Sequence, residues 1–218
     1  MFERTIVRSR PYHGARDRSK LLYAAGMDDL ERLLDEPVRY LEDHRPTIRR
    51  LALSSLAGKP AHCETVARLL DDEEPRVRAE AAEVLGTFGK PALASLLDAA
   101  ARTDEQIVVE AIAAALGEVA DSRATPWLIE VARGNHDTLT RETAVASLGA
   151  IADPSALPVL LELVADGPPH VRRRSVVALT VFDGGEVEAA IRTALTDRNP
   201  MVREAAEMVV GRPSAGEP

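Results

Sequence analysis

One pattern returns about every 31 residues along most of this chain. Its clearest copy runs over residues 72–97, where an acidic turn leads through a proline into a short apolar-periodic helix, which a second short helix follows. The residue that begins each copy recurs in steps of 29 to 32 residues, at Pro46, Pro75, Gln106, Thr138, Pro169 and Pro200. Self-similarity over five successive steps predicts a solenoid, in which each unit packs mainly against its neighbours.

Equivalent positions in the copies carry similar residues. In the second copy Val77, Ala81 and Leu85 are spaced i, i+4 and i+8, which places them on one helical face. By the same spacing, we expect first helices near 46–57, 75–86, 105–117, 138–150, 169–181 and 200–210. We expect second helices near 61–70, 91–101, 123–133, 155–165 and 186–195.

Three features of the repeats resemble HEAT-like repeats, of the type also found in phycobilisome lyases. They are the Pro-x-Val-Arg entries, the second-helix runs such as 156–163, and the Leu-Gly pairs at or near which the first helices stop, Leu85-Gly86, Leu116-Gly117 and Leu148-Gly149. The resemblance covers roughly residues 20–211 and implies an all-α, right-handed solenoid of about six helix pairs. That family includes adaptors, scaffolds, regulatory subunits and a few enzymes, so the resemblance selects no single function.

The chain divides into three expected segments: a basic arm over 1–17, the solenoid over 18–211, and a disordered tail over 212–218. The start of the solenoid departs from the repeat, with short helices over 20–25 and 28–34 and another from Pro37. We interpret this unit as a cap, because an end repeat has one face without a neighbour.

Charge is unevenly distributed, and it limits the partners. The net charge is −8, of which the first twenty residues contribute +4 and the remaining chain −12. An acidic body argues against binding of duplex nucleic acid. Cys63 is the only cysteine, and no run approaches the ~20 apolar residues of a membrane span. We therefore expect a cytoplasmic protein that binds neither duplex nucleic acid nor membranes, while its oligomeric state is unknown.

An acid and an arginine recur six residues apart, at Asp43 and Arg49, Asp72 and Arg78, Asp166 and Arg172, and Asp197 and Arg203. We expect each arginine to reach an acidic turn in a neighbouring copy and so to tie the repeats together. Val109 occupies the arginine position of the third copy. That junction should therefore rely on apolar packing alone.

The sequence offers little support for catalysis. The histidines lie in separate segments, at His13, His44, His62, His136 and His170. They form none of the paired His-Glu steps by which HEAT-like deoxyhypusine hydroxylases hold iron, so we expect no catalytic residue, no metal site and no cofactor.

These observations favour a noncatalytic scaffold that holds another protein, or an extended basic peptide, on the surface of the second helices. Alignment of those helices predicts two columns of partner-binding residues. The first should point toward the groove of the solenoid and consists of Arg68, Ser95, Trp127, Val159 and Ala189. The second lies three residues further on and consists of Asp71, Asp98, Glu130, Glu162 and Arg192. Trp127 would be the apolar anchor, although it could instead cover the packing of its neighbours. The alternative is an enzyme or enzyme-accessory subunit that acts on a small cofactor in the concave groove, as a lyase would.

Overall fold

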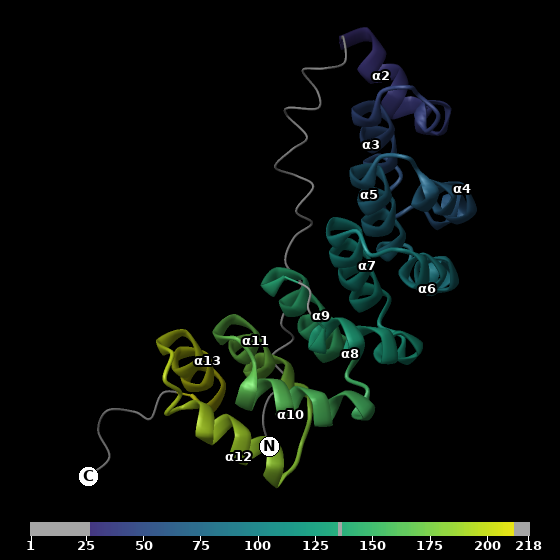
Figure 1. Ribbon diagram of the computed structural model, residues 1–218. Coiled ribbons are helices and arrows are strands. Elements are labelled where there is room, and N and C mark those ends of the chain that lie inside the picture. Colours follow the sequence, from purple (N-terminus) through teal and green to yellow (C-terminus); the bar gives the residue numbers. More distant parts are fainter. Residues whose placement is uncertain (1–26, 135–136, 212–218) are drawn as a thin grey trace.

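The computed structural model describes residues 27–134 and 137–211, and within them every regular element is helical (Figure 1). The predicted arm over 1–17, the expected helix over 20–25 and the predicted tail over 212–218 lie outside these residues. The chain is an all-α solenoid, as the repeat pattern predicts.

The first helices of the repeats begin where the sequence predicts, and four of the six start at a proline, whose fixed φ suits the first helical position. They are α3 (Pro46–Ser54), α5 (Pro75–Gly86), α7 (Gln106–Val119), α9 (Thr138–Ile151), α11 (Pro169–Ala178) and α13 (Pro200–Val210). The short 3₁₀ turn η8 (Leu179–Val181) extends α11 to the end that the sequence predicts.

Most second helices are entered through a short 3₁₀ turn. They are η3 (Pro60–His62) with α4 (Cys63–Ala67) and η4 (Arg68–Asp71), η5 (Lys90–Ala92) with α6 (Leu93–Arg102), η6 (Ser122–Ala124) with α8 (Thr125–Arg133), η7 (Pro154–Ala156) with α10 (Leu157–Asp166), and α12 (Gly185–Ala194). Aspartates cap two of these entries: the side chains of Asp121 and Asp153 accept from the backbone N–H groups of Arg123 and Ser155.

The helices form two rows, one of first helices and one of second helices (Figure 1). Close contacts continue from α3 through α5, α7, α9 and α11 to α13, whereas neighbouring second helices contact each other sparsely. In the view of Figure 1 the row of first helices follows the inner side of the bend, and the second helices follow its outer side. The second helices therefore have more room between them than the first helices do.

Three glycines allow the first helices to approach one another. A methyl group at Gly86 would lie 2.9 Å from the Cα atom of Ala115, and one at Gly149 would lie 3.0 Å from the Cα atom of Ala178. One at Gly117 would overlap Ser147. The first helices end near their Leu-Gly pairs, as predicted, although α7 and α9 continue past the glycine to Val119 and Ile151. At these two positions glycine permits the close packing of neighbouring helices, and it does not terminate its own helix.

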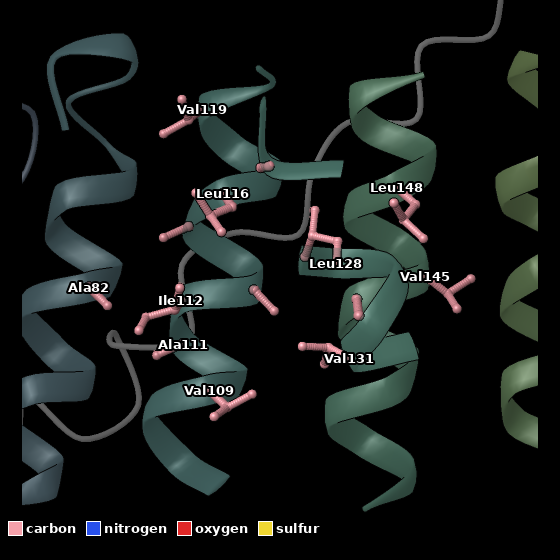
Figure 2. Packing of buried hydrophobic residues seen from close by; sticks show 14 of the residues in the cluster. Ala82, Val109, Ala111, Ile112, Leu116, Val119, Leu128, Val131, Val145 and Leu148 are labelled. Atoms are coloured by element: carbon pink, nitrogen blue, oxygen red, sulfur yellow. The ribbon is translucent and has the colours of Figure 1, made fainter. Parts of the chain in front are cut away.

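A continuous apolar core lies between the two rows. Figure 2 shows part of it, with Leu116 on α7, Leu128 and Val131 on α8, and Val145 and Leu148 on α9. Each of these side chains is at most 3% exposed. Since every repeat contributes the same positions, the core extends along the array and has no single centre.

The N-terminal cap has a small core of its own. It consists of α2 (Met27–Asp35) and η2 (Pro37–Tyr40), which pack at the start of the first-helix row. Leu33 of α2 packs there with Ile48 and Leu51 of α3. The cap thus covers the apolar side of α3 that has no preceding repeat.

Candidate functional site

Two of the repeat arginines bridge neighbouring copies, as predicted. The guanidinium of Arg49 donates to both carboxylate oxygens of Asp72 at 2.7 Å, and that of Arg172 donates to both oxygens of Asp197 at 2.8 and 2.7 Å. All four side chains are at most 13% exposed. The hydrogen bond from Arg172 lowers the pKa of Asp197. These bidentate pairs are structural contacts between repeats.

The other repeat arginines do not reach a carboxylate of the next copy. Arg78 donates to the backbone carbonyls of Asp72 and Glu73, and Arg203 donates to the carbonyl of Asp197. The expectation that every such arginine pairs with a neighbouring acid is therefore wrong for Arg78. Asp72 is held by Arg49 of the preceding copy instead, because the carboxylate points back along the array.

The third junction also differs from its prediction. Val109 is buried at 2% exposure, as expected for an apolar contact. A hydrogen bond nevertheless crosses this junction, because the hydroxyl of Ser147 on α9 donates to the backbone carbonyl of Ala113 on α7 at 2.7 Å. Apolar packing alone is therefore not the correct description of the contact between α7 and α9.

The structure places most of the predicted partner-binding residues at the surface of the second helices. Arg68, Asp71, Asp98, Glu130 and Glu162 are exposed, and Ser95 and Trp127 are half-buried. Val159 is the exception: its side chain is only 1% exposed, so it packs in the core and is not available to a partner. Ala189, the last residue of the same column, is exposed. In Figure 1 the second helices follow the outer side of the bend, so the predicted position of these residues in a groove is wrong in this view.

Arginines cross-link the acidic strip, by which we mean Asp71, Asp98, Glu130 and Glu162. Arg102 donates to Asp71 at 2.5 Å and to Asp98 at 2.9 Å, and Arg133 donates to Glu162 at 2.5 Å. Sequence reasoning missed both arginines, although Arg102 lies four residues after Asp98 in the last turn of α6. The strip is thus less negative than predicted, and it links successive second helices.

Trp127 is intermediate in burial between the two positions that the sequence left open. It is half-buried and packs against the apolar core, yet part of its side chain remains at the surface of α8. Glu130 is exposed one turn further along the same helix, and it takes part in no salt bridge within the described residues. An aromatic side chain beside an accessible carboxylate can contact a basic side chain of a partner.

A second polar feature lies on the first-helix row. A shallow hollow of about 310 Å³ is lined by Arg50, Arg76, Ala79, Glu80, Glu83 and Ile107. Glu80 is 5% exposed and accepts from the Ser54 hydroxyl at 2.5 Å and from Arg50 at 3.2 Å. Burial raises the pKa of Glu83 to about 7, with Glu80, Glu110 and Glu118 adding to the rise and Arg50 opposing it.

We expect stability to depend on pH through Glu83. Its folded-state pKa of about 7 exceeds the ordinary value of 4.5, so between these values the folded chain binds more protons than the unfolded chain. The free energy of unfolding should therefore fall as pH rises through this window, by about 1–2 kcal/mol after allowance for partial exposure. Urea unfolding of Glu83→Gln between pH 4.5 and 8 should show a flatter profile than the wild type. Identical profiles would contradict this assignment.

The described residues contain no group of three or more His, Cys, Asp or Glu side chains that could hold a metal ion. His13 and His136 lie outside those residues. Among the helices that the structure describes, none is long and apolar enough to cross a membrane.

Comparison with known proteins agrees with the two-row arrangement. A family model described as HEAT repeats matches residues 34–117 and 108–180, which together cover most of the solenoid. The chain belongs to the HEAT repeat family. No curated protein matches it.

Several solved structures have a similar helical solenoid fold. The complex of CpcE and CpcF of phycocyanin lyase from Nostoc sp. PCC7120 contains a chain that is 21% identical, with a TM-score of 0.56 over 69% of this chain and 98% of that one. The Escherichia coli protein YibA is 18% identical, with a TM-score of 0.60 over 93% and 77% of the two chains. A designed armadillo repeat protein in complex with the peptide (KR)4 is 15% identical, with a TM-score of 0.51 over 88% and 95%. At these identities the likeness shows the fold alone.

Proposed function

We propose that this HEAT repeat chain is a noncatalytic scaffold that holds another protein, or an extended basic peptide, on the surface of its second helices. The observation that carries the proposal is the acidic strip, which crosses successive second helices beside the partly exposed Trp127. Carboxylates that are spaced along a rigid row can pair with basic residues spaced along an extended partner. We also propose that the protein is cytoplasmic and that it does not bind duplex nucleic acid.

The proposed contact residues follow from exposure. They are Arg68, Asp71, Ser95, Asp98, Trp127, Glu130 and Glu162. Glu130 is the primary carboxylate, because Asp71, Asp98 and Glu162 are already paired with Arg102 or Arg133. A partner's basic side chain would have to compete with those two arginines. We therefore expect the centre of the strip, at Trp127 and Glu130, to contribute most to binding.

Two of the similar structures support this proposal. The designed armadillo repeat protein binds the peptide (KR)4, so a solenoid of related architecture can hold an extended basic peptide. The phycocyanin lyase structure is a complex of two protein chains, CpcE and CpcF. Both are precedents for complexes of such proteins with a protein or peptide partner.

The (KR)4 peptide is a suitable first probe. We expect Glu130→Arg and Trp127→Ala each to weaken its binding about tenfold, measured by fluorescence anisotropy at about 0.15 M salt. Emission from Trp127, the only tryptophan, should change when the peptide binds to the wild type. Once a natural partner has been captured and identified by mass spectrometry, the same variants apply to it.

Glu204→Arg is the matched control, because it changes the net charge equally on an exposed position of α13. This variant should retain nearly the wild-type affinity. If it weakens binding as much as Glu130→Arg does, the peptide responds to overall charge and the second-helix surface is not its site. Circular dichroism of each variant would confirm that the solenoid remains folded.

A further inference from the structure

Arg203 of α13 has one of the contacts that hold the two bidentate arginines, but not the other. In Arg49 and Arg172, Nη1 donates to a backbone carbonyl of the turn before the helix, while Nε and Nη2 donate to an aspartate of the next copy. Arg203 likewise donates from Nη1 to the carbonyl of Asp197, at 2.8 Å. Its Nε and Nη2 atoms form no hydrogen bond with any residue that the structure describes. The guanidinium is therefore positioned with its carboxylate-binding edge open.

The apolar side chains at the end of α13 are also uncovered. Ten residues after the start of each of the other five first helices stands a leucine that is 0% exposed: Leu56, Leu85, Leu116, Leu148 and Leu179. The equivalent residue of α13 is Val210, which is 53% exposed, and Met208 beside it is 75% exposed. Figure 1 shows α13 at the end of the row of described helices. The apolar surface that a following helix covers in the other copies is thus accessible here.

The charges of α13 are mixed. The helix carries three charged residues, Arg203, Glu204 and Glu207. Both glutamates are exposed, and within residues 27–134 and 137–211 neither has an ion-pair partner. Arg198, in the turn before the helix, is exposed as well. A partner at this surface must therefore offer a carboxylate to Arg203 and a cation to the glutamates.

The junction between α9 and α11 shows how a following helix meets such a glutamate. Glu204 stands four residues after the start of α13, and Glu142 stands four residues after the start of α9. The carboxylate of Glu142 lies 3.6 Å from the guanidinium of Arg173, which is four residues after the start of α11. A helix that packed on α13 in the same register would place its own fourth residue near Glu204.

We propose that the free side of α13, by which we mean Arg203, Glu204, Glu207, Met208 and Val210, binds a helix of a partner protein. The partner helix begins shortly after an aspartate, whose carboxylate accepts from Nε and Nη2 of Arg203. Its apolar side chains cover Met208 and Val210, and a basic side chain near its start lies beside Glu204. The interaction goes beyond the proposed function, because it uses the end of the array and not the second-helix surface.

Continuity of the first-helix row favours a helix as the occupant. Each of α5, α7, α9 and α11 packs between two other first helices, whereas α13 packs closely against α11 alone. A second copy of the chain fits less well. Two free sides that faced each other would bring together four glutamates and two arginines, which leaves an excess of like charge. A separate partner can supply the missing carboxylate and cation together.

The probe is a labelled peptide of residues 197–211, which form an aspartate turn and a helix that packs on a first helix in the structure. The peptide carries Glu204→Arg, so that its arginine can meet Glu204 of the protein. A lactam bridge holds it helical and lowers the entropic cost of binding. The control peptide carries Asp197→Asn in addition, which removes the charge of the carboxylate and retains its size. We expect the probe to bind the full chain about tenfold more tightly than the control, by fluorescence anisotropy at about 0.15 M salt.

Variants of the full chain locate the binding. Arg203→Lys should remove most of the preference for the probe over the control peptide, because lysine keeps the charge but cannot form the bidentate pair. Met208→Ser should weaken both peptides about tenfold, and it should remain folded because the side chain is 75% exposed. Trp127→Ala and Glu130→Arg should leave the binding unchanged, which separates this surface from that of the second helices.

Equal affinity for the two peptides would overturn the proposal. So would an Arg203→Lys variant that is folded by circular dichroism and keeps the full preference for the probe. Sedimentation velocity and a shortened chain test the other occupants. A dimer that Met208→Ser dissociates would assign the free side to a second copy, and probe binding that requires removal of residues 212–218 would assign it to that segment. Either result would overturn the assignment to a separate partner.

Discussion

Replacing Arg172 by alanine should lower the free energy of unfolding by about 3–5 kcal/mol. The guanidinium is 1% exposed and donates to both carboxylate oxygens of Asp197 and to the carbonyl of Gly167. Its removal leaves the carboxylate of Asp197 with only the backbone N–H of Asn199 as a described donor. A buried charge that loses its partner is costly, because the medium around it solvates it poorly. Urea unfolding followed by circular dichroism measures the loss.

Arg203→Ala is the matched control, because Arg203 occupies the same repeat position on α13. It makes one described hydrogen bond, to the carbonyl of Asp197, so its replacement should cost about 0.5–1.5 kcal/mol. The opposite ranking of the two variants would show that bidentate pairing between copies does not determine their stability. Hydrogen exchange should become faster in α11 and α13 when Arg172 is lost, because the contact joins the repeats that contain these helices.

The sequence predicts the repeat frame well because every copy repeats the same local signals. Proline entries, apolar spacing and the acidic turns mark each helix independently, so the predicted starts of the first helices agree with the structure. Errors arise where one copy meets another. The geometry of the junction determines the direction in which the Asp72 carboxylate points. It therefore also determines that Asp72 pairs with Arg49 and not with Arg78.

The same distinction, between what local sequence determines and what contacts between repeats determine, applies to the candidate site. Exposure of Asp98 and Glu130 follows from helical spacing, which is local information. Burial of Val159 and the pairing of Arg133 with Glu162 depend on how α10 turns relative to α8. On the first helices, the exposed apolar side chains of Ile107 and Leu139 had a visible signal, since they stand where the neighbouring copies have Arg76 and His170. Their adjacency becomes evident only when α7 and α9 are placed side by side.

Replacing Gly117 by alanine should also have a large effect, a net loss of about 2–4 kcal/mol. In an isolated helix this change would be favourable by up to about 1 kcal/mol, because alanine has the higher helix propensity. Here the new methyl group would overlap the side chain of Ser147 on the adjacent helix. Either the helices separate or Ser147 loses its buried hydrogen bond to Ala113. The packing cost therefore exceeds the gain in propensity.

Two further variants test this explanation of Gly117. Gly185→Ala is the control: a methyl group there meets no atom within 4 Å at the start of α12, so stability should be unchanged or slightly higher. Ser147→Gly in the Gly117→Ala background vacates the overlapped space and should recover part of the loss. A double-mutant cycle from urea unfolding measures that coupling. Strictly additive effects would mean that the two helices do not meet at this pair, and the close approach of α7 and α9 would then need another cause.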